Sequence, residues 1–287
     1  IRQVEQFEAV LNWRSPVPSV ALDVIYCDYR DIAHYRVAVT GKQPAVWIAL
    51  ASPRICKPGE EHLLRMIAEL RPDAVLVRNL TALSFFRTHL PGVTLVGDTS
   101  LNVTNEFTAR ELKAAGLSRL TPGYDLNTAQ VDDLCRRAPE VSFELMAFSH
   151  APLFHTAHCI AAACLKSGDH CDHCRQPCRK HLFALRDRQG VQHPLLFDAA
   201  GRNTVFNSRS DSIILRPRGR LNLKSGKSRR LEGAPRSADG RGDSPAVPSL
   251  RIDQGQLPRY WRVEFVRESE QEISSLLNNC AAALSHQ

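Results

Sequence analysis

Residues 58–77 read PGEEHLLRMIAELRPDAVLV, an amphipathic segment followed directly by a short apolar one. In Pro58–Leu70 a proline stands near the start, glutamates occupy the first turn, and leucine and isoleucine recur at helical spacing, which predicts a helix with one buried face. Ala74–Val77 is brief, apolar and preceded by Asp73, which predicts a buried strand. The stretch therefore forms one helix–strand unit.

Similar units lie on both sides of this stretch. Further short apolar runs typical of strands are Val20–Tyr26, Ala45–Ala51, Val93–Val96, Ser118–Thr121 and Val141–Phe148. Thr104–Ala115 predicts another helix, with Gly116 as its C-cap. Strand starts recur about every 20 to 29 residues, the period of βα units in a parallel sheet. Because no Gly-x-Gly-x-x-Gly turn favours a doubly wound sheet, we expect an α/β fold of the TIM-like (β/α) barrel type, complete or partial.

Length and composition limit the class of protein. The 287 residues suffice for one large domain or two small ones, and 43% hydrophobic with 23% charged residues excludes collagen-like, fully disordered and coiled-coil chains. No apolar run is long enough for a transmembrane helix, and the first residues do not resemble a signal peptide. We expect a cytoplasmic protein without a membrane partner. Because the chain starts with Ile1, we expect the N-terminal portion of a longer protein to be missing.

Positive charge is concentrated in one region. The formal net charge is +7, and Gly201–Arg262 holds 14 basic and 5 acidic residues, so this region carries +9 and the rest of the chain −2. Such a region can attract nucleic-acid phosphates or an anionic surface, or it can be a solvated linker. We expect four parts: barrel units in 1–150, a cysteine-rich segment in 151–207, a basic disordered linker in 208–258, and a strand with a helix in 259–287.

Polar residues follow several of the predicted strands. In parallel α/β barrels the chemistry lies at the carboxyl ends of the strands, so these residues are candidates for substrate binding. Each can equally be a helix cap or a member of an ion pair. The candidates are Arg78, Asn79, Asp98, Asn102, Tyr124 and Asp125.

Five of the nine cysteines lie within twenty residues. They are Cys159, Cys164, Cys171, Cys174 and Cys178. An odd total without a secretory signal argues against a disulfide framework, and thiolates two or three residues apart can converge on one metal ion or cluster. Spacing does not separate an iron–sulfur cluster from zinc, which His158, His170 or His173 could help to bind. Buried free cysteines are the remaining interpretation.

Several motifs resemble the collagenase-like peptidases, unclassified peptidase family thirty-two. They include Pro152-Leu153-Phe154-His155, His158-Cys159, Cys174-Arg175-Gln176-Pro177-Cys178-Arg179-Lys180-His181, Leu185-Arg186-Asp187-Arg188, His193-Pro194-Leu195 and Arg202-Asn203-Thr204-Val205-Phe206-Asn207, with upstream matches at Val77–Leu80, Gly97–Asn102 and Thr121–Asn127. The resemblance covers about residues 1–207, resumes weakly at Tyr260–Glu268, and is strongest to the C-terminal barrel repeat of longer members.

The resemblance implies a TIM-like barrel with an iron–sulfur cluster of the 4Fe–4S type held by four cysteines. Cys159, Cys174 and Cys178 match three ligand positions, whereas Gly201 occupies the fourth, immediately before the Arg-Asn-Thr motif. Cys171 is our expected replacement, Cys164 is another, and zinc is the alternative metal.

The family's name implies proteolysis, yet the sequence has neither a His-Glu-x-x-His helix nor a Gly-x-Ser-x-Gly elbow. Better-understood relatives hydroxylate RNA bases or a quinone ring. Three hypotheses follow: an iron–sulfur enzyme of the RNA-base hydroxylation type, a metal- or cysteine-dependent endopeptidase, and a non-catalytic degenerate barrel.

Overall fold

The computed structural model describes residues 1–165, 177–212 and 260–285. Most of the predicted linker, together with Cys171 and Cys174, lies outside the described residues. The described parts confirm an α/β fold with a parallel sheet.

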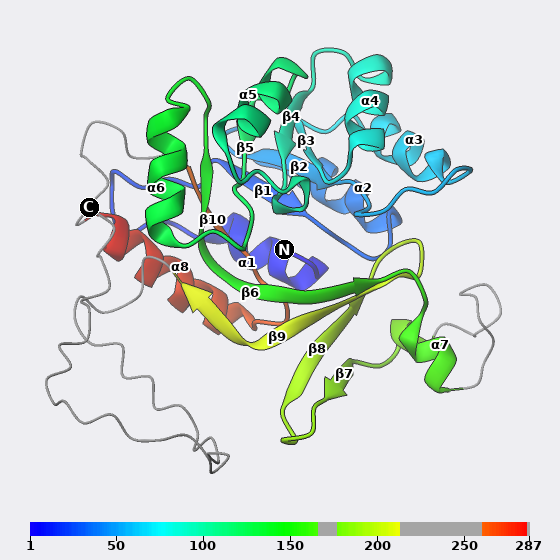
Figure 1. Ribbon diagram of the computed structural model, residues 1–287. Coiled ribbons are helices and arrows are strands. Elements are labelled where there is room, and N and C mark those ends of the chain that lie inside the picture. The colour runs from blue at the N-terminus through cyan, green and yellow to red at the C-terminus, as the bar shows by residue number, and fades with distance from the viewer. Residues whose placement is uncertain (166–176, 213–259, 286–287) are drawn as a thin grey trace, which may run out of the picture.

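Five parallel strands follow one another in sequence order in the first sheet (Figure 1). They are β1 Val24–Cys27, β2 Trp47–Ala51, β3 Ala74–Val77, β4 Thr94–Gly97 and β5 Arg119–Leu120. The connecting helices are α2 Ala33–Thr40, α3 Glu61–Glu69, α4 Leu80–His89 and α5 Glu106–Ala114, with the short η1 Thr99–Leu101, and α6 Thr128–Arg137 follows β5. Sequential parallel pairing brings all the strand carboxyl ends to one edge of the sheet.

The observed elements are shorter than several predicted ones because local caps define their ends. The helix predicted over Pro58–Leu70 begins at Glu61, after a turn in which Gly59 has a φ of +89°. The helix predicted from Thr104 begins after Asn105, whose side chain accepts the Thr108 N–H. Such a side-chain acceptor satisfies an N–H group that has no partner within the helix.

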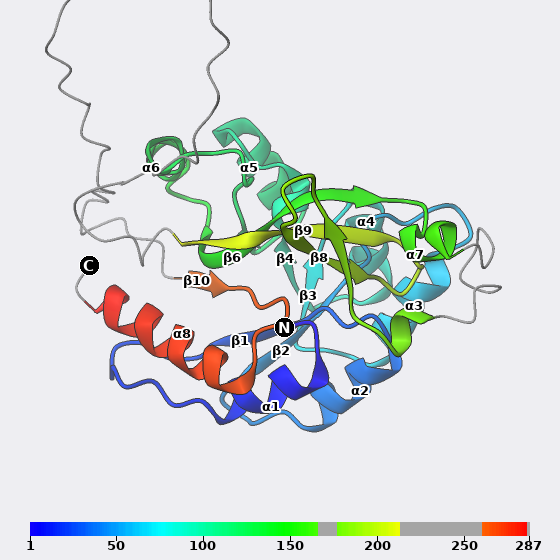
Figure 2. The ribbon, with the colours of Figure 1, turned by 90° about the horizontal axis from the view of Figure 1, so that it is seen from below.

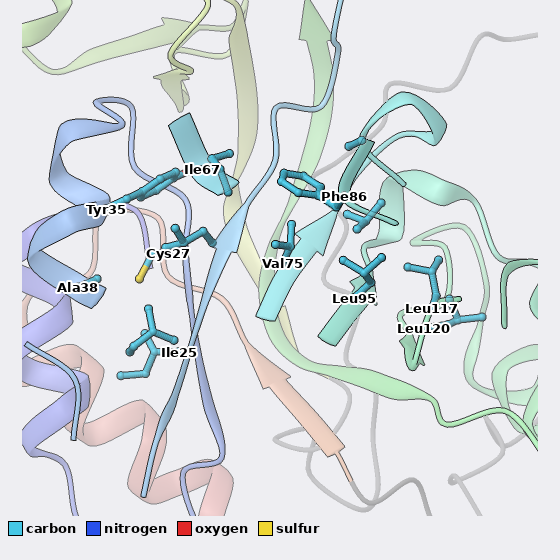
Figure 3. Packing of buried hydrophobic residues seen from close by; sticks show 14 of the residues in the cluster. Ile25, Cys27, Tyr35, Ala38, Ile67, Val75, Phe86, Leu95, Leu117 and Leu120 are labelled. Atoms are coloured by element: carbon cyan, nitrogen blue, oxygen red, sulfur yellow. The ribbon is translucent and has the colours of Figure 1, made fainter. Parts of the chain in front are cut away.

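The outer face of the parallel sheet packs against the helices. Ile25, Val75 and Leu95, from β1, β3 and β4, are buried there (Figure 3). Ile48 of β2 is buried in the same cluster. Burial of apolar area on this face supplies the main stabilising free energy of the unit. At the end of β4, a Cβ atom added to Gly97 would lie 2.8 Å from a methyl carbon of Leu120, so close packing requires glycine at this position.

The long strand β6, Glu144–Thr156, connects the first sheet to a second one. Its first residues pair in parallel with β10, Tyr260–Val263, and the residue before it bridges to β5. Its later residues pair antiparallel with β9 Asn203–Ser212, followed by β8 Gln192–Phe197 and β7 Phe183–Arg186. The short α7 Ile160–Cys164 and η2 Pro177–Arg179 lie between β6 and β7. β6 thus crosses the boundary placed at residue 150, and β9 crosses that at residue 208.

The two end helices of the described chain lie side by side (Figure 2). They are α1 Val4–Asn12 and α8 Glu270–Leu284, and the Trp13 indole N–H donates to Asn278 Oδ1 at 2.9 Å. Among the described residues no strand ladder joins β10 to β1, so the strands form an arc there and a closed barrel is not shown. None of the described helices has the length and apolar character needed to cross a membrane.

Candidate active site

A cavity of about 210 Å³ lies between the carboxyl ends of the parallel strands and the second sheet. Residues after β1, β2 and β3 form one wall, among them Asp28, Arg54 and Arg78. The opposite wall comes from the antiparallel sheet and the segments beside it. It includes His155, Cys178, Phe183, Leu195, Phe197, Asp198 and Thr204. Because β6 carries the second sheet over the strand ends, the cavity lies where α/β barrels place their chemistry.

A buried ion network holds the strand ends in place. Arg78 forms a bidentate pair with Asp28, with N···O distances of 2.7 and 2.8 Å, and its Nε donates to Asp98 at 2.9 Å. Burial disfavours the ionised carboxyls, but the Arg78 guanidinium outweighs it and holds the pKa of Asp28 and Asp98 well below their usual range. Both acids therefore stay ionised and paired, which makes Arg78 a structural wall of the cavity.

His155 and Asp198 form the least satisfied polar pair in the cavity wall. His155 Nε2 lies 4.0 Å from Asp198 Oδ2, and neither buried atom has a hydrogen-bond partner among the described residues. The other ring nitrogen of His155 hydrogen-bonds with the Thr204 hydroxyl at 2.8 Å. Thr204 thus orients the imidazole and leaves Nε2 available to a ligand.

The surroundings of His155 and Asp198 shift the pKa values of the two side chains in opposite directions. Burial, followed by the positive charge of Arg54, lowers the pKa of His155 to about 4. Burial raises the pKa of the Asp198 carboxyl to about 6. At neutral pH a neutral imidazole therefore lies beside a carboxylate, and groups so placed can accept and return a proton.

Two of the four predicted metal ligands lie within the described residues. Cys178 lines the cavity, whereas Cys159 is buried at the start of α7 and its sulfur accepts the Ala162 N–H. No group of three or more metal-binding side chains occurs within residues 1–165, 177–212 and 260–285. The described thiols therefore do not make up a ligand set by themselves.

Gly201 lies close to Cys159 in space. The Asn203 side chain accepts the N–H of Ile160, next to Cys159, at 2.5 Å and donates to the Gly201 carbonyl at 3.3 Å. The buried Asn203 side chain thus connects the backbone next to Cys159 with Gly201, the position at which the resemblance places the fourth cysteine. The glycine has a φ of +76°, a conformation that favours glycine over residues with a side chain.

The six predicted substrate-binding residues divide into two groups. Arg78 lines the cavity, Asp98 lies behind it, and the Tyr124 hydroxyl donates to Glu264 at 3.2 Å in the adjoining ion network. Of the six, only Arg78 lines the cavity. Asn79 caps α4 and donates to the Pro53 carbonyl, and Asn102 and Asp125 are exposed.

The sequence prediction did not place His155, Asp198 or Arg54 among the site residues. Arg54 does follow a strand, and His155 lies in one of the matched motifs. Asp198 carried no signal, because it enters the site through the β8–β9 turn of a sheet that was not predicted.

Comparisons with known proteins give a family match and several matching solved structures, two of which are described below. Residues 58–216, more than half of the chain, match the family described as Peptidase family U32. One solved structure is the U32 peptidase Mk0906, with 15% identity, a TM-score of 0.38, and coverage of 47% of this chain and 64% of that one. Another solved structure, from Coccidioides immitis, is provisionally assigned as a fructose-1,6-biphosphate aldolase. It has 15% identity and a TM-score of 0.38, and the match covers 50% of this chain and 61% of that one. No curated protein matches the sequence. The chain thus spans less than two thirds of either solved relative.

Proposed function

Because the chain belongs to peptidase family U32, we propose that it is part of an iron–sulfur enzyme that modifies RNA bases by a hydroxylation-type reaction. The supporting observation is the composition of one cavity: a cysteine from the predicted ligand set, a neutral imidazole beside a carboxylate, and walls of arginine and aromatic residues. In this proposal the described strands belong to a TIM-like barrel whose mouth holds the target base.

The cavity walls suit a flipped base. The Phe183 and Phe197 rings meet edge to face at 5.4 Å, and the Arg30 guanidinium lies 5.8 Å from the centre of the Phe197 ring. Aromatic rings and guanidinium planes are the usual stacking partners of unpaired RNA bases. Basic residues of the region Gly201–Arg262, other than the buried and ion-paired Arg202 and Arg262, would neutralise phosphates outside the cavity.

We propose Cys159, Cys171, Cys174 and Cys178 as the cluster ligands. Cys178 lies in the cavity wall, and Gly201 lies near Cys159, so the fourth thiolate has to come from another part of the chain such as Cys171. When bound, the cluster would supply redox chemistry next to the base. Zinc is the alternative occupant.

The chain's own residues orient the substrate and move a proton. Arg78, fixed by two carboxylates, gives the cavity a rigid wall. His155, oriented by Thr204, presents Nε2 as a proton acceptor at neutral pH, and the Asp198 carboxylate lies beside it to stabilise the protonated ring. A positioned acid–base group of this kind contributes a factor of about 10² to 10⁴ in rate.

RNA mass spectrometry tests the proposed function. A deletion strain is expected to lose one modified nucleotide, and the full-length wild-type gene to restore it. Cys178→Ser should fail to restore it, and Cys135→Ser, which changes a half-buried cysteine outside the ligand set, should succeed. An unchanged set of nucleotides in the deletion strain would contradict the proposal.

Metal analysis of anaerobically purified full-length protein tests the cofactor separately. About four iron and four sulfide per chain are expected for a cluster. Stoichiometric zinc without sulfide would contradict the iron–sulfur cluster and indicate a zinc site.

A peptidase is the second candidate. The thiol of Cys178, the imidazoles of His155 and His181, and the carboxyl of Asp198 all line one cavity, and thiol, imidazole and carboxyl are the groups used in cysteine-dependent hydrolysis. Cleavage of gelatin or casein by the full-length protein, lost in Cys178→Ser but not in Cys135→Ser, would select this function. If the full-length protein neither modifies RNA nor cleaves protein, the non-catalytic barrel remains.

A further inference from the structure

The arginines around the cavity differ in how their charge is balanced. Arg78 and Arg2 are paired with carboxylates, which hold their charge in place. For Arg30, Arg54 and Arg267, which also line the cavity, no carboxylate of the described residues lies within 4 Å of the guanidinium. Buried or half-buried cations without counter-charges are costly unless a ligand supplies one.

Arg267 shows this imbalance most clearly. Its guanidinium donates to the backbone carbonyls of Phe183 and Leu195, which carry no net charge, and its buried Nε has no partner among the described residues. Burial lowers the pKa of Arg267, so the surrounding protein leaves its positive charge uncompensated.

Arg30 lies on the other side of the same aromatic pair. Its guanidinium faces the Phe197 ring, which contacts Phe183, and Phe183 supplies one of the carbonyls that bind Arg267. One buried nitrogen of Arg30, Nη1, has no hydrogen-bond partner among the described residues. Arg30 and Arg267 each thus have a buried nitrogen without a partner among the described residues, and both contact residues of this aromatic pair, Arg30 the Phe197 ring and Arg267 the Phe183 backbone.

Arg54 brings a third positive charge, from the wall formed by residues that follow the parallel strands, just after β2. Its guanidinium donates no hydrogen bond to any described residue, and its charge acts on Asp28, Asp98 and His155 across the mouth of the sheet. Neither cavity carboxylate pairs directly with these three arginines, since Asp28 is paired with Arg78, and the ion-pair partner of Asp198 among the described residues is His155.

We propose that Arg30, Arg54 and Arg267 form an oxyanion-binding subsite of this cavity and that it holds a phosphate group of the nucleotide substrate. The three residues line one cavity, and their guanidinium groups provide N–H donors and positive charge, the chemistry by which proteins bind phosphate. The assignment to a nucleotide rests on the proposed function, whereas the oxyanion subsite rests on the charges and unpartnered donors alone.

Binding of three probes to the full-length protein tests the subsite: inorganic phosphate, uridine 5′-monophosphate and acetate, each followed by calorimetry. Arg54→Gln and Arg30→Gln are each expected to weaken phosphate binding at least about tenfold, because each removes one charged donor. The matched control is Arg36→Gln on α2, which removes the same charge from an exposed side chain outside the cavity. Circular dichroism confirms that each variant is folded.

The outcomes separate the subsite from the enzyme activity. Phosphate binding weakened by the two cavity variants and not by Arg36→Gln supports the subsite, whatever the RNA assay shows. Equal binding by all variants, or equal weakening by all three, overturns it even if the chain modifies RNA. Binding of acetate but not phosphate, with the same dependence on Arg54, overturns the phosphate assignment and leaves a carboxylate as the ligand.

Discussion

A single imidazole carries the acid–base chemistry proposed for this cavity. His155 is fixed by Thr204, and its Nε2 is left without a protein partner among the described residues. We expect His155→Gln to lower RNA modification by a factor of about 10² to 10⁴, because the variant keeps the size and hydrogen bonding of the side chain but cannot accept a proton. Turnover of the full-length enzyme measures the effect, and an unchanged rate would remove His155 from the mechanism.

The pH dependence of the same site follows from its carboxyl group. Burial raises the pKa of Asp198 to about 6, whereas His155 stays neutral above a pH of about 4. If the ionised carboxyl supports the reaction, activity should fall as the pH drops through about 6. In Asp198→Asn the rate should be lower and should no longer change around pH 6. A wild-type pH–rate profile that is flat between pH 5 and 7 would contradict this assignment.

At the scale of elements, His150 joins β6 to the segment between β10 and α8. Its Nδ1 lies 2.8 Å from the Asn207 carbonyl, and its Nε2 lies 2.9 Å from a Glu268 carboxylate oxygen. Both partners are acceptors, so both ring nitrogens donate and the ring is positively charged. Burial opposes that charge, but the Glu268 carboxylate and the Asn207 carbonyl outweigh it and raise the pKa of His150.

This raised pKa gives the sign of a stability change with pH. A histidine whose pKa is higher in the folded state than in the unfolded state stabilises the folded protein. This stabilisation is complete below the unfolded-state pKa of about 6.5 and is lost as the pH rises through the folded-state pKa. We expect His150→Gln to lower the free energy of unfolding by about 1 kcal/mol at pH 6 and by less at pH 9. Urea unfolding at the two pH values measures it, with the exposed His34→Gln as control. Equal losses at both pH values would show that His150 acts without its charge.

Predictability from sequence also differed between elements. Helix α8, Glu270–Leu284, confirms the helix predicted within residues 259–287, because Ser269 and Glu272 form a capping box and the apolar residues recur at helical spacing. The first four parallel strands were found because most of their residues are apolar and buried, completely so in β3, which gives short apolar runs. Strands β7 and β8 were not predicted, since they are short, only one of their residues, Leu195, is fully buried, and no long apolar run identifies them.

The same difference explains the site. Residues after the parallel strands could be predicted as its first wall, and Arg78 was found in that way. The second wall depends on the bend of β6 and the pairing of β9 with it, which are contacts between segments far apart in sequence. For that reason the sequence did not predict that Asp198 lies beside His155.

For the whole molecule, one buried arginine ties the C-terminal segment to the parallel sheet. Arg262 on β10 donates to Asp98 at 2.7 Å and to Glu144 at 2.5 Å, and its Nη2 donates to the Thr121 hydroxyl at 3.0 Å. Arg262→Met would leave buried carboxylates without their counter-charge, which typically costs about 3 to 5 kcal/mol. Chemical unfolding is expected to show a loss of this size. A loss under 1 kcal/mol would mean that Arg78 and Arg119 compensate the carboxylates without it.

Strands β10 and β6 pair with each other although they are far apart in the sequence, so the chain can be divided between them. A chain cut between residues 212 and 260 would yield two polypeptides whose contacts include a parallel strand pair, the packing of α1 on α8 and the buried Arg262 charge network. Because none of these contacts needs an intact peptide bond between the two pieces, they should reassemble when co-expressed. The protein is therefore suited to a split reporter, in which the shorter piece, carrying β10 and α8, restores the cavity of the longer one.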